Sequence, residues 1–509
     1  MKLDFAGQTR RNMAATAANT ALRMLFPFLN RTLFLWLLGP EFLGLNGLFA
    51  SVIGVLSMAE LGFGGAVISS MYKPVAEDDR DLLRAYLAFY RTAYRWVGAG
   101  IFCAGMCLMP FLRSLVHGSV PPGMDLHVLY FIHLVNAASS YLLYSHRCSV
   151  LAAHNRRDVL VNVNSAVSAA QYLAGFLVLL FTRNYYLYVV TTVVFTLLQN
   201  LAYLHESRRL FPWLEPAGKL PEDKRRKVVS DVKAVFLHKV GGVISNSSDN
   251  LVISAFLGLV AIAAYGNYYY VLTSVGGLVG MICVSMTGGF GNRIHTESKE
   301  DCFRLFMKTA RLAQISILWC VAMLTALYQP FITVWTKGDP ALVRHFLTPA
   351  LMVLFFYVNQ SRQMLLTFKT AAAIWRQDRW KPIVAGAVNL SFNVAFVVLL
   401  PGEYKLDGVI LSTIIGYVCV QIPWETHAVF ANFFGPGPAR VYRRFHARFA
   451  ALALALCAAT WCAASAVGLP GVPGLLAKGC VSAAVSGGAL AAIFRRDLAE
   501  ALVRLRRGR

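Results

Sequence analysis

The chain has 509 residues, of which 57% are hydrophobic and only 14% carry a charged side chain. A soluble globular chain usually has about 25% charged residues, so this composition excludes an ordinary soluble protein. The formal net charge of +23 fits either a nucleic-acid partner or the cytoplasmic loops of a membrane protein, and the positions of the charges decide between them.

Apolar runs of about 20 residues, the length that crosses about 30 Å of hydrocarbon, recur along the whole chain. The basic run from Asp81 to Arg95 is expected to be an amphipathic inner-surface helix that leads into the third span. No small-residue cleavage site follows a short apolar core at the N-terminus, so the first span is expected to be retained. The runs predict about fourteen transmembrane helices, at residues 13–38, 42–70, 96–112, 126–151, 158–181, 185–205, 233–257, 263–289, 305–331, 341–368, 381–400, 407–432, 447–468 and 473–494.

Lys and Arg concentrate in every second connecting segment. One set of segments, which includes both ends of the chain, is crowded with them. The opposite set is short and contains only Arg113, Arg183, Lys337, Arg344, Lys405 and Lys478. By the positive-inside rule this pattern places both termini in the cytoplasm and requires an even number of spans. It also excludes the nucleic-acid interpretation.

The two halves of the chain repeat at an offset of about 220 residues, as in Asp81 and Arg84 against Asp301 and Arg304. Both halves begin on the cytoplasmic side, so the repeat is parallel. We therefore expect an all-α integral membrane protein with two parallel-repeat six-helix lobes around a central cavity, plus two C-terminal helices. The expected parts are an N-terminal lobe (1–210), a cytoplasmic inter-lobe loop (211–232), a C-terminal lobe (233–432), and two additional helices with a basic cytoplasmic tail (433–509).

Polar residues follow one side of the first span. Asn19, Arg23 and Asn30 recur at helical spacing, and Arg31 lies a fraction of a turn away. A charged side chain at mid-bilayer costs roughly 2.5–3.5 kcal/mol on insertion scales. We interpret this stripe as one wall of the central cavity.

The seventh span carries a similar stripe of Lys239, Asn246 and Asp249. The second span adds Glu60 to the deep part of the cavity, and Glu425 is expected at the membrane interface. The remaining candidates, near the cytoplasmic mouth, are Lys73 and Arg293.

Two interpretations of these charges remain open. The basic residues could hold an anion, and a diphosphate suits arginine through bidentate hydrogen bonds. Alternatively, they could pair internally, for example Arg31 with Glu60, and only hold helices together. Glu60 and Asp249 could likewise be proton or cation sites or structural partners.

Other chemistry is not expected. The ten cysteines form no CxxC pair, and the eleven histidines show no HExxH or comparable spacing. We therefore expect neither a metal site nor a cofactor. The sequence also contains no recognisable catalytic arrangement, so an enzyme is not expected.

Four segments carry a resemblance to a known family: LGPEFLGLNGLF (38–49), SMAELGFGGAVISSMYKP (57–74), HKVGGVISNSSDNLVISAFLGLVAIAAYGNYY (238–269) and GNRIHTE (291–297). They resemble the polysaccharide transporter family of the multidrug/oligosaccharidyl-lipid/polysaccharide exporter (MOP) superfamily. The resemblance covers most of residues 10–430.

The resemblance implies two lobes that form a V and work by alternating access. It implies a flippase that moves undecaprenyl-diphosphate-linked oligosaccharide outward across the bacterial plasma (inner) membrane, for capsule or O-antigen biosynthesis. The implied partners are that lipid, membrane lipids, H⁺ or Na⁺, and polysaccharide polymerase machinery. Related lipid II flippases place arginine on the first span, which supports Arg23 and Arg31. The serine-arginine-glycine pattern usual in those flippases is missing here, which argues against lipid II as cargo.

Two alternatives are weighed against this function. A cation-coupled multidrug exporter of the same superfamily is expected to have an acidic, partly aromatic pocket, whereas the first span here is basic. A membrane-embedded polysaccharide polymerase or acyltransferase is expected to have a catalytic histidine or a large outer loop. The predicted outer loops are short, which argues against such an enzyme.

Overall fold

The computed structural model describes residues 25–60, 63–118, 120–143, 145–374, 376–378 and 380–506. Within these ranges, nine helices are long and apolar enough to cross a membrane, or ten if the bent pair Leu126–Leu142 and Arg147–Ala153 is one span. Two shorter apolar helices, Leu25–Leu37 and Pro40–Leu56, precede them. The predicted class, an all-helical multi-pass membrane protein, is confirmed; the figure of about fourteen spans stays a prediction.

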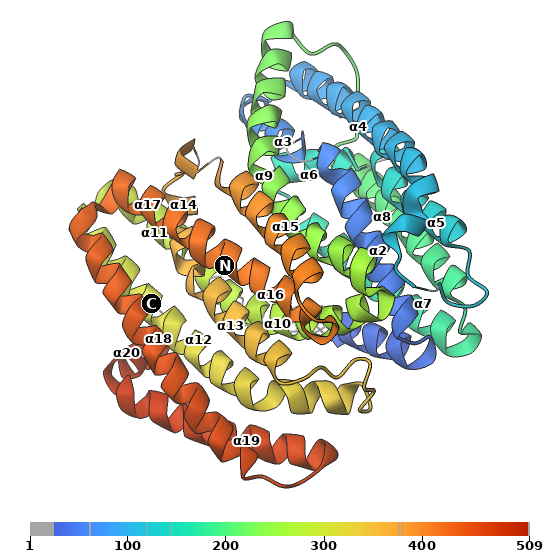
Figure 1. Ribbon diagram of the computed structural model, residues 1–509. Coiled ribbons are helices and arrows are strands. Elements are labelled where there is room, and N and C mark those ends of the chain that lie inside the picture. Colours follow the sequence, from blue (N-terminus) through green and yellow to red (C-terminus); the bar gives the residue numbers. More distant parts are fainter. Residues whose placement is uncertain are drawn as a thin grey trace. The chain divides into compact units, whose positions relative to one another are not determined.

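Contacts divide the chain into two compact units, Met1–Ile262 and Ala263–Arg509. The lobe boundaries predicted from the sequence differ from this division, and they stay a prediction. In the first unit α4 packs on α3 and α5, and α8 packs on α5 and α7. Its elements, beside the helix Leu25–Leu37, are α2 (Pro40–Leu56), η1 (Ser57–Glu60), α3 (Phe63–Ala76), α4 (Arg80–Leu108), η2 (Met109–Leu115), α5 (Leu126–Leu142), α6 (Arg147–Ala153), α7 (Arg157–Thr182), α8 (Tyr185–Leu210) and α9 (Glu222–Leu257) (Figure 1).

Helix α4 is longer than the sequence predicts. Asp79 caps its start by accepting a hydrogen bond from the amide of Leu82 at 3.0 Å, which satisfies one of the free N–H groups of the first turn. The helix then runs unbroken from Arg80 to Leu108. The run from Asp81 to Arg95 and the predicted third span thus belong to one continuous helix, and the position of the run at the inner surface stays a prediction.

Helix α9, which the sequence places at the start of the second lobe, packs on α2 within the first unit. The start of α10, which follows α9 directly, also approaches α2 closely, because α2 has glycine at position 44, where a Cβ atom would overlap the backbone of Leu259. Asn250 of α9 donates a hydrogen bond to the Ser51 hydroxyl of α2 at 2.9 Å. Small residues and side-chain hydrogen bonds are the usual means of joining helices in a membrane.

The segment 211–220, which connects α8 to α9, is held against the first unit by Arg147. This buried guanidinium donates to the carbonyl oxygen of Leu214 at 2.9 Å and to the Glu215 carboxylate at 2.5 Å, and Arg208 donates to Glu215 at 3.0 Å. Burial raises the pKa of Glu215, but the two arginines outweigh it and hold this pKa below its ordinary value. Trp213 stacks under the guanidinium of Arg80, 4.8 Å from its ring centre.

The second unit contains most of α10 and all later elements. Its helices α12, α18 and α19 lie side by side (Figure 1). Ion pairs of Lys308 with Glu500 and of Arg311 with Asp497 tie α20 to α12. The elements are α10 (Leu259–Ser285), α11 (Thr287–Thr296), α12 (Lys299–Trp335), α13 (Leu347–Ser361), α14 (Gln363–Ala371), η3 (Arg376–Asp378), α15 (Lys381–Leu399), η4 (Gly402–Tyr404), α16 (Lys405–Ile415), η5 (Gly416–Gln421), α17 (Ile422–Val429), η6 (Phe430–Phe434), α18 (Pro436–Ser465), α19 (Gly471–Ile493) and α20 (Arg495–Arg506).

Candidate functional site

The first apolar helix, Leu25–Leu37, carries two of the predicted site residues. Asn30 is 5% exposed, and its amide donates to the carbonyl oxygen of Tyr172 in α7 at 3.3 Å, so this side chain faces α7. Arg31 is half-buried and follows Asn30 directly, about 100° further around the helix. The two side chains therefore point in different directions. Asn19 and Arg23 lie outside the described residues.

Helix α9 contributes Asp249, which is 5% exposed. It stands between two buried serines, Ser247 and Ser248, and the α2-facing Asn250. This part of α9 therefore places a carboxylate among polar side chains inside the first unit. Lys239 and Asn246 lie nearer the start of α9, and their side chains are outside the part of the chain that the structure describes.

Glu60 lies in η1, between α2 and α3. Its carboxylate accepts a hydrogen bond from the Tyr94 hydroxyl of α4 at 2.8 Å. Tyr94 is buried and contacts the ring of Tyr90 edge-on, with 4.3 Å between the ring centres. Tyr94, packed against Tyr90, thus holds the Glu60 carboxylate toward α4.

The two residues predicted near the cytoplasmic mouth lie at exposed positions. Lys73, near the end of α3, forms an ion pair with Glu77 at 3.7 Å. Arg293 of α11 forms one with Glu297 at 3.4 Å. Exposed pairs of this kind contribute about 0–1 kcal/mol, so both cations stay available to a ligand. The described candidates form two groups: Asn30, Arg31, Glu60, Lys73 and Asp249 in the first unit, and Arg293 in the second.

The second unit holds a buried group of charges that the sequence analysis did not predict. This charge cluster consists of Arg362, Lys369, Asp378, Lys381 and Glu425. Both carboxylates are 0% exposed, and the expected position of Glu425 at the membrane interface stays a prediction. The signal in the sequence was Arg362, a charged residue inside the predicted span 341–368.

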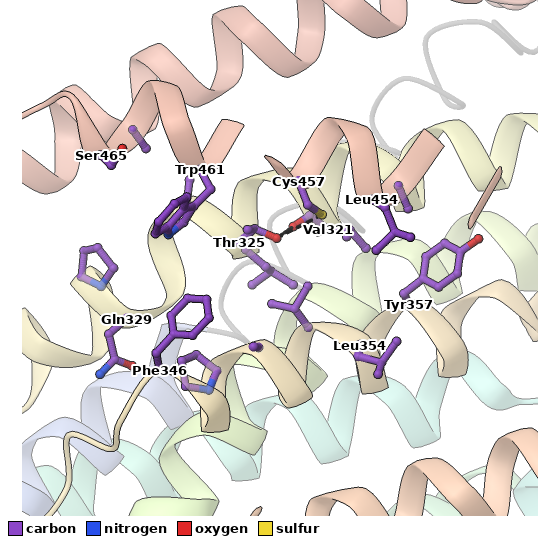
Figure 2. A pocket seen from close by; sticks show the side chains of 18 of the residues that line it. Val321, Thr325, Gln329, Phe346, Leu354, Tyr357, Leu454, Cys457, Trp461 and Ser465 are labelled. Atoms are coloured by element: carbon purple, nitrogen blue, oxygen red, sulfur yellow. Dashed lines mark hydrogen bonds between the residues drawn. The ribbon is translucent and has the colours of Figure 1, made fainter. Parts of the chain in front are cut away.

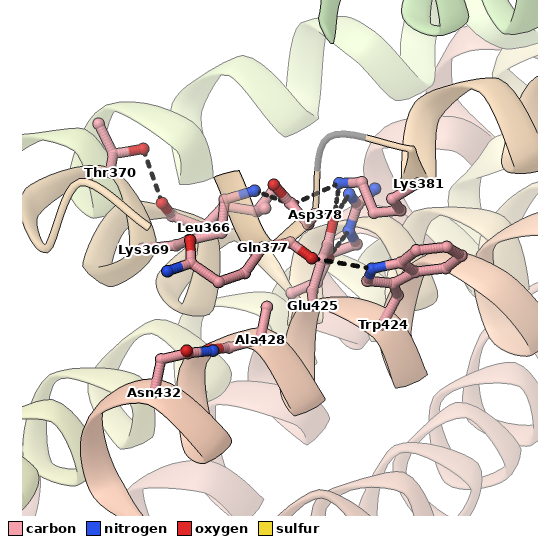
Figure 3. A network of polar contacts seen from close by, with 11 residues as sticks. Leu366, Lys369, Thr370, Gln377, Asp378, Lys381, Trp424, Glu425, Ala428 and Asn432 are labelled. Carbon is pink, nitrogen blue, oxygen red and sulfur yellow. Dashed lines mark hydrogen bonds and ion pairs between the residues drawn. The ribbon is translucent and has the colours of Figure 1, made fainter. Parts of the chain in front are cut away.

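The geometry of the charge cluster links the short elements at one end of the second unit (Figure 3). Arg362 donates to both oxygens of Glu425, with 2.9 Å from Nε to Oε2, and Lys381 approaches Glu425 at 2.5 Å. Lys369 and Lys381 both contact Asp378. Because three cations face two carboxylates, the cluster carries a formal excess of one positive charge.

Two adjoining cavities lie beside α13 and α18. The first, the apolar cavity, has a volume of about 480 Å³ between α12, α13 and α18. Figure 2 shows Phe346 and Trp461 toward one end of it and Tyr357 at the other, with Thr325 hydrogen-bonded to Cys457 between them. The second, the basic cavity, has a volume of about 320 Å³ and shares Tyr357 and Ala450 with the first.

The basic cavity is lined on its polar side by three nitrogen-bearing side chains, Arg362, Arg443 and His446. In the described part of the chain no carboxylate lines it. Glu425 lies behind Arg362, which also stacks on the ring of Tyr417 at 4.7 Å from the ring centre. The wall is therefore largely apolar, and the charged side chains in it are cationic.

A sequence profile described as "Polysaccharide biosynthesis protein" matches residues 9–286, more than half of the chain. The chain belongs to this family. The family recognised from the sequence motifs is thereby confirmed. No curated protein sequence matches the chain.

Solved structures share the fold of this polysaccharide biosynthesis family member. The lipid II flippase MurJ in an inward closed conformation aligns over 95% of this chain and 99% of its own, with a TM-score of 0.66 and 13% identity. An inward-facing multidrug resistance MATE transporter of the MOP superfamily aligns over 79% and 94%, with a TM-score of 0.56 and 14% identity. The Vibrio cholerae MATE transporter VcmN in the bent form aligns over 85% and 95%, with a TM-score of 0.50 and 13% identity. The protein thus has the fold of MOP-superfamily transporters.

Proposed function

We propose that this protein is a flippase for undecaprenyl-diphosphate-linked oligosaccharide repeat units. It moves them by alternating access from the inner to the outer leaflet of the bacterial plasma membrane, where they enter surface polysaccharide biosynthesis. Membership of the polysaccharide biosynthesis family and the MOP transporter fold support this assignment. Both termini are cytoplasmic in this proposal, as the distribution of Lys and Arg predicts.

The observation that carries the proposal is a half-buried arginine, Arg31, in a predominantly apolar helix. Its guanidinium is always charged and can bind two phosphate oxygens at once. Arg23, Asn19 and Asn30 on the same predicted helix, and Lys73, Lys239, Asn246 and Arg293 elsewhere, complete the proposed contacts to diphosphate and sugar. A helix that only supported the fold would not need this charge, whose insertion costs roughly 2.5–3.5 kcal/mol.

No covalent bond is made or broken in the proposed cycle, so the protein acts as a transporter and not as an enzyme. The diphosphate and sugar are too polar to cross hydrocarbon unaided, whereas the polyprenyl tail stays dissolved in it. Outward movement of negative charge is favoured by an inside-negative potential, by about 2.3 kcal/mol per charge per 100 mV. Glu60 and Asp249 are the proposed sites for a coupling proton or Na⁺.

Transport by the purified full-length protein in liposomes tests the proposal. The vesicles contain lipid-linked oligosaccharide labelled in its sugar, and a glycosidase added outside reports how much label reaches the outer leaflet. Arg31→Ala is expected to lower the translocation rate about tenfold or more, and Arg31→Lys less, because lysine keeps the charge but loses the bidentate contact. Arg113→Ala, at an exposed position of η2, is the matched control and is expected to leave the rate unchanged.

Two results would overturn the proposal. Unchanged transport by Arg31→Ala would remove Arg31 from the site. Failure of the wild-type protein to move the labelled lipid, together with expulsion of a cationic dye, would instead support a multidrug exporter.

A further inference from the structure

The basic cavity has a chemistry that the proposed transport cycle does not use. Its wall combines the guanidinium of Arg362, which belongs to the charge cluster with one excess positive charge, and the exposed guanidinium of Arg443. The carboxylates that neutralise the cluster are fully buried and lie away from the cavity. An anion in this cavity therefore meets cations without meeting a carboxylate.

His446 lines the basic cavity beside the two arginines. Its Nδ1 lies 3.5 Å from the Nε2 of Gln314. Its Nε2 atom is buried, so the ring contributes to the shape of the cavity wall, and Arg362 and Arg443 contribute its charge.

The adjoining apolar cavity indicates that the anion carries an apolar group. It begins at Tyr357 and Ala450, which line both cavities. Its other walls include Leu454 and Trp461, whose side chains are 74% and 48% exposed on the surface of an apolar, membrane-spanning helix. This cavity is therefore open to hydrocarbon and suits an acyl chain.

The size of the basic cavity limits the head group. Pockets for small molecules have volumes of about 300–1,000 Å³, and about 320 Å³ is at the lower end of this range. It accommodates a phosphate with a small polar substituent, which is the head group of a phospholipid.

We propose that the second unit binds an anionic phospholipid, with its phosphate in the basic cavity at Arg362 and Arg443 and an acyl chain in the apolar cavity. Arg443 belongs to the segment 440–448, which the charge pattern places on the inner side. The bound lipid is thus a resident of the inner leaflet. This site is separate from the residues proposed to hold the cargo, so it does not depend on the proposed function.

Native mass spectrometry of the full-length protein, titrated with phosphatidylglycerol or zwitterionic phosphatidylcholine, tests this site without cargo or transport. Arg443→Ala is expected to weaken phosphatidylglycerol binding about tenfold, the loss of one charge-assisted contact. Arg444→Ala is the matched control: it removes another exposed arginine, next in the same helix, that does not line the cavity. Ala450→Trp, which obstructs the junction of the two cavities, is expected to weaken lipid binding without removing any charge.

Three outcomes would overturn the proposal. Equal losses in Arg443→Ala and Arg444→Ala would mean general attraction of anionic lipid to a basic surface. Equal binding of the two lipids would remove the role of the charges. Displacement of the lipid by an equal concentration of inorganic phosphate, with no effect of Ala450→Trp, would identify a site for free phosphate instead. Arg362 is left unchanged in these variants because its loss would disrupt the charge cluster.

Discussion

Arg362 and Glu425 face each other inside the second unit and share two hydrogen bonds, although they are 63 residues apart in the sequence. The pair joins the junction of α13 and α14 to α17, and Lys381 brings in the start of α15. A buried ion pair is poor evidence for net stabilisation, but removing one partner leaves an uncompensated buried charge. The energetic consequence therefore appears when the pair is broken.

Glu425→Gln is expected to destabilise the protein by about 3–5 kcal/mol, because Arg362 and Lys381 lose their shared buried carboxylate. The measurement is the midpoint of thermal unfolding of the detergent-solubilised protein. Glu77→Gln, in the exposed pair with Lys73, is the control and is expected to cost less than about 1 kcal/mol. Equal shifts in the two variants would show that burial of the Glu425 pair has no energetic consequence.

Arg147→Met is expected to release the segment 211–220 from the first unit. The variant loses the contacts to Leu214 and Glu215 but keeps the apolar volume of the buried side chain. Trypsin cleavage after the exposed Lys219, followed by mass spectrometry, is expected to become several-fold faster. Arg208→Met removes one exposed hydrogen bond to the same carboxylate and should change the rate much less. Identical rates in both variants would contradict the anchoring role of Arg147.

The contribution of Glu215 is expected to depend on pH. Its pKa lies below the ordinary value in the folded protein, because Arg147 and Arg208 outweigh the effect of burial. The stabilisation is therefore fully present above the unfolded-state pKa of about 4.3 and is lost as the pH falls through the lower folded-state value. The difference in unfolding temperature between wild type and Glu215→Gln should stay constant from pH 7 to about pH 6 and shrink below about pH 4. A difference that disappears near neutral pH would disprove this assignment.

Gly44→Ala is expected to destabilise the first unit by about 1–3 kcal/mol, because the added methyl group would overlap the backbone of Leu259 and push α2 from the start of α10. Gly65→Ala in α3 is the matched control, since its Cβ would meet no atom within 4 Å. That change is expected to be neutral or stabilising by up to about 1 kcal/mol, through the loss of glycine flexibility. Thermal unfolding of the two variants side by side distinguishes overlap from helix propensity.

Apolar run length predicted the positions of several helices closely. The predicted spans 158–181 and 185–205 correspond to α7 (Arg157–Thr182) and α8 (Tyr185–Leu210). The same signal underestimates helices that continue beyond the hydrocarbon: the span 305–331 is the middle of α12, Lys299–Trp335. Hydropathy indicates where the chain passes from hydrocarbon to water. The helix itself can continue into water when the residues there favour helical hydrogen bonding.

The contacts of the candidate site residues could be predicted from the sequence only in part. Helical periodicity placed Asn30 on a polar stripe, but only the packed structure shows that it faces Tyr172 of α7. The pairing of Arg362 with Glu425 depends on two helices that meet only after folding. A single sequence gives the direction of a side chain around its own helix and does not give the neighbour on that side.

Helix α9 has 36 residues and runs unbroken from Glu222 to Leu257, so it is about 54 Å long. The hydrocarbon core accounts for about 30 Å of such a rod. Several turns, including the charged stretch from Glu222 to Lys227, must therefore stand clear of the acyl chains. Because the helix is long, a small change in the tilt of its membrane-embedded part moves the N-terminal end by a larger distance. A spin label near Glu222 would therefore detect movements of the embedded helices from the aqueous side.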